Sequence, residues 1–295
     1  DRLTPENVER LRSLLAGLDA APRAFLMNTA CWSEFSCEGY TLISHPRLFA
    51  RATGMKWQGR VHEQLRAAEH GTPVEAVFSD VRIDHHGYAE QAMQQRKLQR
   101  NVRLLRMDFA VDPDNVSTLL HLGLTYYQLR RWEEARKYLL RLVAIASPAD
   151  EHLRQVHGSL AHIAMLEGNL QEALRVLEQG LEAFPTDEYL LFLRAECLYD
   201  LDRYDDAINT LIQIVAGPER PLYQGGTPGE IRSRLAPRKL ADSLRLKRQY
   251  APAESLLRSL VERFPQDTHS WPLLGRVYLA TPPRDTLSNA VERFP

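Results

Sequence analysis

Residues 173–185 read ALRVLEQGLEAFP, and residues 253–265 read AESLLRSLVERFP. Each stretch begins with an alanine, has a leucine four positions later and ends with a proline eight positions after that leucine. Residues four apart lie on the same face of a helix, and a proline after such a run ends the helix. Three matching positions in two distant stretches indicate an internal repeat made of helices.

The first half of this pattern occurs twice more, as Ala135 with Leu139 and as Ala207 with Leu211. The four alanines are 38, 34 and 46 residues apart along the chain. The middle spacing equals the period of the tetratricopeptide repeat, a helix–turn–helix unit, and the others are this period with insertions. This part of the sequence therefore resembles a tetratricopeptide array.

A small residue precedes each repeat alanine by twelve positions. It allows the two helices of a unit to pack closely, because a larger side chain would hold the backbones apart. Residues 271–278, WPLLGRVY, match the start of a fifth unit, whose second helix is expected at 285–294. The small residues are Gly123, Ala161, Ala195 and Ala241.

Stacked repeats form a solenoid, and ligands commonly bind along the surface made by the first helix of each unit. Counting along the repeats places both charges and aromatic rings on that surface. Such a mixture would suit a protein or a glycan, although the same side chains could simply be solvated. The predicted groove residues are Tyr127, Gln128, His162, Phe192, Glu196, Tyr199, Arg238, Asp242 and Arg245.

Charge and composition exclude several classes of function. The chain has 37 basic and 38 acidic residues, so no global field favours nucleic acid or an anionic membrane surface. No apolar run is long enough for a transmembrane segment. The three cysteines form neither a C-x-x-C pair nor a disulfide framework, which predicts a reducing, cytoplasmic location.

The first ninety residues have a different character. Thr4-Pro5-Glu6 predicts the start of a short amphipathic helix, since a hydroxyl caps it and proline is tolerated at its first position. Apolar runs at 24–27, 41–43 and 74–83 predict strands. We therefore predict a mixed fold: a partial α/β part over 1–89, a linking helix over 90–115, and an all-α solenoid over 116–295.

Residues 47–63 read RLFARATGMKWQGRVHE and carry polar residues that neither helix surfaces nor turns require. One interpretation is a binding edge between strands. The other is a surface loop followed by a capped helix that begins at Glu63. The zinc-helix motif H-E-x-x-H fails here, because Arg66 stands where the second histidine would be. A metal-dependent hydrolase using His62, His85 and His86 is a weaker third possibility.

The string R-L-F, then W-x-G-x-V-H-E, then Ile83 to Tyr88 resembles the C-terminal part of bacterial family-2 glycosyltransferases of the GT-A fold that carry tetratricopeptide repeats. The resemblance implies transfer of a sugar from a nucleotide-sugar donor with inversion, assisted by Mg2+ or Mn2+. It also places the donor-binding half and its paired aspartates before Asp1. The chain without that half is expected to be inactive.

The resemblance also implies individual roles. Glu63 would be the base that deprotonates the acceptor, and His62 would orient it or touch the metal-bound diphosphate. Trp57 would stack on a sugar. Arg47 and Arg60 would bind phosphate or acceptor, and Asp1 and His86 would lie near the metal.

Two functions thus remain open. The chain is either the acceptor side of a glycosyltransferase fused to repeats that recruit a protein or glycan acceptor, or a non-catalytic interaction scaffold with a vestigial N-terminal domain. The first requires Arg47, Trp57 and the pair His62-Glu63 to converge in one open cleft at the carboxyl ends of strands, where open α/β sheets bind ligands.

Overall fold

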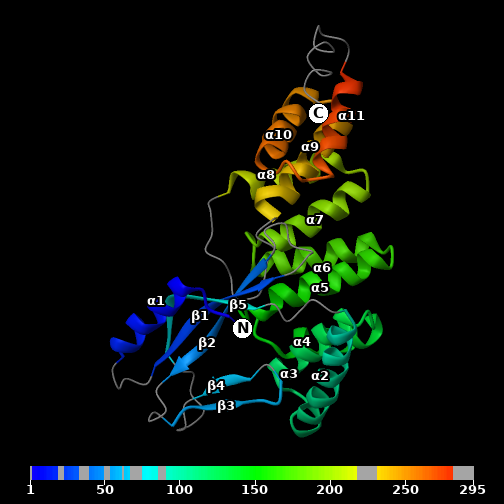
Figure 1. Ribbon diagram of the computed structural model, residues 1–295. Coiled ribbons are helices and arrows are strands. Elements are labelled where there is room, and N and C mark those ends of the chain that lie inside the picture. The colour runs from blue at the N-terminus through cyan, green and yellow to red at the C-terminus, as the bar shows by residue number, and fades with distance from the viewer. Residues whose placement is uncertain are drawn as a thin grey trace. The chain divides into compact units, whose positions relative to one another are not determined.

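The computed structural model describes residues 2–18, 23–32, 40–49, 54–61, 63–66, 75–85, 91–217 and 231–281. The chain forms two compact units, of which the first extends to Ser159 and the second begins at Leu160. The boundary lies within helix α5 (His152–Leu166). Figure 1 shows the order of the helices and strands along the chain.

The first unit opens with one helix and a three-stranded mixed sheet (Figure 1). Strand β1 lies in the middle, antiparallel to β2 and parallel to β5. The three predicted strands and the mixed α/β character are confirmed, although every strand is longer than its apolar run. The elements are α1 (Pro5–Ala16), β1 (Arg23–Trp32), β2 (Tyr40–Phe49) and β5 (Glu75–His85).

Helix α1 begins as predicted but attaches to the sheet through a polar side chain. The hydroxyl of Thr4 accepts hydrogen bonds from the backbone N–H and the side-chain amide of Asn7. The amide oxygen of Asn7 in turn accepts the backbone N–H of Arg82 on β5 at 2.8 Å. Asn7 is the buried residue of this helix, whereas Leu15 is exposed. The predicted apolar face is therefore only partly covered among the described residues.

A two-stranded hairpin follows β2. Strand β3 (Lys56–Gln58) pairs antiparallel with β4 (Gln64–Arg66), so that Trp57 lies opposite Leu65. The alternative prediction of a helix beginning at Glu63 is wrong. Leu65 and Met55 bury together against Ala24 of β1, and an extended backbone at β4 brings Leu65 there.

Helix α2 spans residues 91–111 of the predicted linking segment and packs against the first repeat. Leu105 of this helix is 2% exposed. In the repeat, a Cβ added to Gly123 would lie 2.4 Å from Cδ2 of Leu139, so the two helices pack as closely as the sequence predicts. The helices are α2 (Gln91–Val111), α3 (Val116–Gln128) and α4 (Trp132–Ile145).

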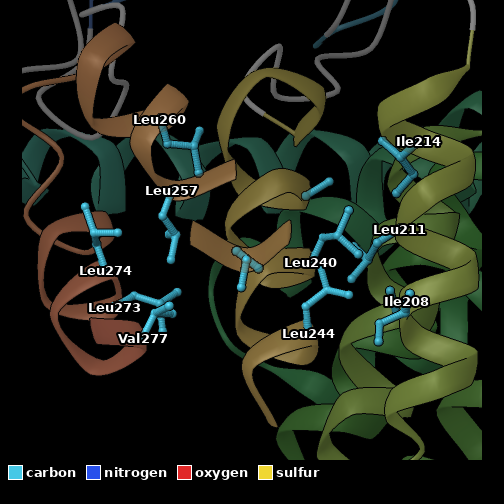
Figure 2. Packing of buried hydrophobic residues seen from close by; sticks show 14 of the residues in the cluster. Ile208, Leu211, Ile214, Leu240, Leu244, Leu257, Leu260, Leu273, Leu274 and Val277 are labelled. Carbon is cyan, nitrogen blue, oxygen red and sulfur yellow. The ribbon is translucent and has the colours of Figure 1, made fainter. Parts of the chain in front are cut away.

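The second unit continues the helix pairs. Its core joins neighbouring helices through fully buried aliphatic side chains, among them Leu211, Leu257 and Val277 (Figure 2). The helices are α6 (Leu170–Ala183), α7 (Glu188–Asp200), α8 (Tyr204–Ala216), α9 (Ala236–Leu246), preceded by a π-helical turn (Ile231–Leu235), α10 (Tyr250–Arg263) and α11 (Ser270–Ala280). The 46-residue spacing between Ala207 and Ala253 predicts an insertion near 217–229, of which residues 218–229 lie outside the described residues. The helix expected at 285–294 also lies outside them.

All four repeat alanines, and the small residues Ala161, Ala195 and Ala241 that face them in the pattern, are fully buried. The spacing of twelve residues is therefore a packing requirement. It places one small residue on each helix of a pair, where only hydrogen or methyl fits between backbones. None of the helices that the structure describes is long and apolar enough to cross a membrane.

In each of the four repeats that contain a repeat alanine, the turn between the two helices has a residue with a left-handed backbone conformation. This residue always stands five positions before the repeat alanine. The φ angles are 57°, 77°, 58° and 58° for Arg130, Gly168, Asp202 and Arg248. Only one of the four is glycine, although this backbone region is unfavourable for other residues. The helix pairing therefore imposes the conformation on three side chains that would otherwise avoid it.

A capping residue precedes the first helix of several units. Asn115, Asp187 and Asp267 each stand two positions after a proline. The side chains of Asn115 and Asp187 accept a backbone N–H three residues later, at 3.0 and 2.9 Å. Proline ends the preceding helix and the cap starts the next one. The sequence pattern Pro-x-Asp/Asn thus marks the start of these three repeats, and the sequence analysis did not use it.

Candidate functional site

A groove of about 560 Å³ lies in the second compact unit, between the first helices of successive repeats. Helices α7, α9 and α11 line it, together with the turn before α11. Four predicted groove residues are part of this lining: Phe192, Glu196, Arg238 and Asp242. The remaining lining residues are Leu235, Lys239, Thr268, His269, Pro272, Leu273 and Arg276.

One side of the groove is apolar. Leu273 is 7% exposed and belongs to the core, and Phe192 packs against the same core while remaining partly accessible. Pro272, next to Leu273, is exposed. A ligand in this groove would therefore cover apolar surface that is already held in place by the helices.

A polar network joins α7 to α9 along the same groove. The hydroxyl of Tyr199 donates to Oδ2 of Asp242 at 2.6 Å, and Nη2 of Arg245 lies 2.6 Å from Oδ1 of Asp242. Lys239 Nζ lies 3.3 Å from Oε1 of Glu196 and 4.4 Å from the centre of the Tyr199 ring. Burial, and then the hydrogen bond to Asp242, raise the pKa of Tyr199, so its hydroxyl remains a donor.

Asp267 ties the turn before α11 to the arginines of the adjacent helix. Its carboxylate accepts the hydroxyl of Ser270 at 2.7 Å and the backbone N–H of His269 at 3.1 Å. Arg238 lies 3.3 Å away and Arg234 3.8 Å away. Burial alone would raise the pKa of Asp267, but the hydrogen bonds and the two guanidinium groups outweigh it and lower the pKa.

Arg276 differs from the other charged residues of the groove. It is exposed on α11 and forms no ion pair with any residue in the described part of the chain. His269, at the same end of the groove, has a side chain that is 73% exposed. The sequence analysis did not select these two residues or Lys239, because their place in the groove depends on how α9 and α11 pack.

The other predicted groove residues lie outside this lining. His162 is half-buried on α5. Burial lowers the pKa of His162, and the nearby charge of Glu196, which would raise it, has the smaller effect. In the first unit, the Tyr127 ring lies 5.6 Å from that of Trp132, and burial raises the Tyr127 pKa. Gln128 is exposed.

The residues to which the resemblance assigned catalytic roles do not lie where a glycosyltransferase site would require them. Under that interpretation they should converge at the carboxyl ends of β1 and β5. Arg47 instead lies at an irregularity of β2, beside the amino-terminal end of β1. The Trp57 ring lies 6.0 Å from that of Phe49, which pairs with Ala24 at the same end.

The hairpin loop carries the remaining described residues of this set. Arg60 forms an ion pair with Asp108 of α2, and Glu63 is exposed. Asp1, His62 and His86 lie outside the described residues. Within the described ranges, no group of three or more His, Cys, Asp or Glu side chains is placed to hold a metal ion.

Antiparallel helix pairs with small residues at every pair interface, and a groove along the first helices, define a helical repeat protein. Three models of the tetratricopeptide repeat match residues 114–186, 164–225 and 239–267. This part of the chain therefore consists of tetratricopeptide repeats, as the 34-residue spacing predicted.

Three solved structures are similar to part of this chain. A tetratricopeptide repeat protein from Parabacteroides merdae is similar with a TM-score of 0.50 and 16% identity, over 64% of this chain and 68% of that one. PilF from Pseudomonas aeruginosa reaches 0.48 and 17% identity, over 63% of this chain and 76% of its own. YrrB, whose structure is described as having an unusual peptide-binding site, reaches 0.46 and 16% identity, over 61% and 84%. No curated protein matches the sequence.

Proposed function

We propose that this chain is a protein-interaction scaffold whose repeat groove binds an extended segment of a partner protein. The observation that carries the proposal is the groove between α7, α9 and α11. It combines an accessible apolar side with charged groups, and its volume is in the range of ligand sites. The first helices of repeats supply it, which is where repeat proteins present their binding surface.

The polar network supports this function by fixing the groove before a ligand arrives. Asp242 is held by both Tyr199 and Arg245, and Glu196 is held by Lys239. Side chains that are already ordered lose little conformational entropy on binding. These groups therefore shape the groove, and the apolar side chains beside them supply contact area.

Phe192→Ala tests the proposal. We expect about tenfold weaker binding of peptides, because an aromatic ring at the centre of an interface commonly contributes more than 1 kcal/mol. Binders are first selected from a labelled pool of random twelve-residue peptides. Fluorescence anisotropy with the pool and then with the selected peptides measures the change in affinity. Ile212→Ala, on the exposed part of α8 and outside this groove, is the control. Unchanged affinity of Phe192→Ala at an unchanged melting temperature would contradict peptide binding in this groove.

A glycosyltransferase acceptor site is a second candidate, favoured by the exposed Trp57 on the same hairpin as Glu63. Trp57 is 48% exposed, so part of this side chain is accessible to a ligand such as a sugar. A Cβ on Gly59 would lie 3.7 Å from Cα of Glu63, and Gly59 has a φ of 107°, which keeps the loop tight. The described residues supply no metal site, so the proposal concerns the acceptor side, with nucleotide sugar and Mg2+ or Mn2+ held elsewhere.

Glu63→Gln separates this candidate from a vestigial domain. In the protein as its cell makes it, a catalytic Glu63 predicts that transfer from nucleotide sugars is lost while donor binding persists. Mass spectrometry of acceptors and calorimetry with the donor give the two measurements. Glu75→Gln, at an exposed position at the start of β5, is the control. Transfer at the unaltered rate in Glu63→Gln would exclude Glu63 as the base.

A further inference from the structure

The charges that line the groove do not balance. Arg238, Lys239 and Arg276 are basic, whereas Glu196 and Asp242 are acidic. The balance matters because the rim of a groove selects partners of the opposite sign.

Both acids are already used within the protein. Glu196 is paired with Lys239, and Asp242 with Tyr199 and Arg245. Of the basic residues, Arg238 is paired with buried Asp267. A ligand that displaced these partners would leave a partly buried charge without compensation, which is costly. These paired side chains are therefore poor binding groups for a charged ligand, whether it is acidic or basic.

Arg276 is the cation of the lining that has no ion pair in the described part of the chain. Pro272 and Leu273 precede it by four and three residues on α11, so all three lie on the same side of that helix. An accessible guanidinium thus stands next to apolar surface. A guanidinium next to apolar surface fits a ligand that has a carboxylate beside an apolar side chain, because arginine binds carboxylates through two parallel hydrogen bonds.

We propose that the groove selects an acidic segment of a partner protein, in which one carboxylate binds Arg276 and a neighbouring apolar side chain covers Leu273 and Phe192. This inference rests on the proposed peptide binding and names its ligand class. It also assigns Arg276 as the residue that determines specificity. The paired residues Asp242 and Arg245, which the sequence suggested as contacts, hold the groove in shape.

Two labelled peptide pools test the inference with the intact chain. Both are random twelve-residue pools with fixed central positions, which are Glu-Leu-Glu in one and Gln-Leu-Gln in the other. We expect the acidic pool to bind about five- to tenfold more tightly in low salt, and Arg276→Gln to remove that preference. Arg263→Gln, an exposed arginine on α10 outside the groove, is expected to keep it. Raising the salt concentration should reduce the preference in the wild-type protein.

The outcomes distinguish the two proposals. Equal binding of both pools, with affinity still lost in Phe192→Ala, would overturn the acidic class and keep peptide binding. No binding of either pool would overturn both. A twelve-nucleotide single-stranded DNA that bound more tightly than the acidic pool would assign Arg276 to phosphate instead. Melting temperatures within about 2 °C of wild type for both arginine variants would show that charge and not folding is tested.

Discussion

Leu257→Ala is expected to destabilise the second unit by about 2–5 kcal/mol, because it removes a fully buried side chain and leaves a cavity. Leu257 is 0% exposed in the middle of α10 and belongs to the core that joins α8 to α11 (Figure 2). In a repeat array each unit contacts only its neighbours, so the loss should stay local. Hydrogen exchange should accelerate in α9, α10 and α11 while the amides of α3 and α4 are unchanged.

Leu166→Ala is the matched control, since the same atoms are removed from a side chain that is 55% exposed. Its effect on urea unfolding should stay within about 0.5 kcal/mol. If Leu257→Ala accelerated exchange in every helix to the same extent, the chain would unfold as one cooperative body. The description of stability as a sum over neighbouring units would then be wrong.

Asp267→Asn is expected to cost about 2–4 kcal/mol at pH 7, because it leaves Arg238 and Arg234 partly buried without their carboxylate. The Asp267 side chain is only 1% exposed, while those of the two arginines are 23% and 15% exposed. Asparagine keeps one oxygen for the hydrogen bonds of the turn, so the substitution tests the charge more than the cap.

The pH dependence of this variant follows from the sign of the pKa shift. The folded-state pKa of Asp267 is below its ordinary value, so its carboxylate stabilises the fold at neutral pH. This contribution is complete above about pH 4, near the pKa of an unfolded aspartate, and is lost as the pH falls through the folded-state value. Urea unfolding at pH 7 and pH 3 should show a smaller difference between wild type and variant at pH 3.

Asp205→Asn provides the comparison, because Asp205 is paired with Lys247 at 2.8 Å but its side chain is 69% exposed. An exposed ion pair contributes at most about 1 kcal/mol, so this variant should unfold close to wild type at both pH values. A difference for Asp267→Asn that did not shrink at acid pH would mean that its cost comes from the hydrogen bonds of the turn.

Several parts of the fold follow from local sequence. The repeat alanines and their small partners are recognisable because helix packing demands a small side chain at one fixed position in every unit. Ala207 and Ala253 are examples, and each is fully buried. The cap of α1 by Thr4 is equally local, since the residues involved are three apart.

Other features were misjudged because they depend on residues distant in the sequence. The hairpin at 56–66 was considered as a helix start at Glu63, and it is extended because Leu65 buries against Ala24, about forty residues earlier. Asn7, which is buried, was not singled out by the sequence analysis. Its amide satisfies the backbone N–H of Arg82 on β5, and that partner is not visible in a local pattern.

The candidate groove was predicted in part. Counting along the repeats selected Phe192, Glu196 and Arg238, and all three line the groove, because position within a first helix fixes the side that a residue faces. It also selected Arg245, which instead pairs with Asp242. Sequence position gives the face of a helix, but it does not tell which charges on that face have already found a partner.

The sequence by itself determined the helical repeat, the positions of close helix contact and the mixed character of the first ninety residues. These follow from periodicity and from the size of side chains, which act within one turn or one repeat. The tertiary structure decided which charges of the described residues form ion pairs with one another. An ion pair such as Lys239 with Glu196 joins residues 43 positions apart, and only the packing of α7 against α9 brings them within 3.3 Å.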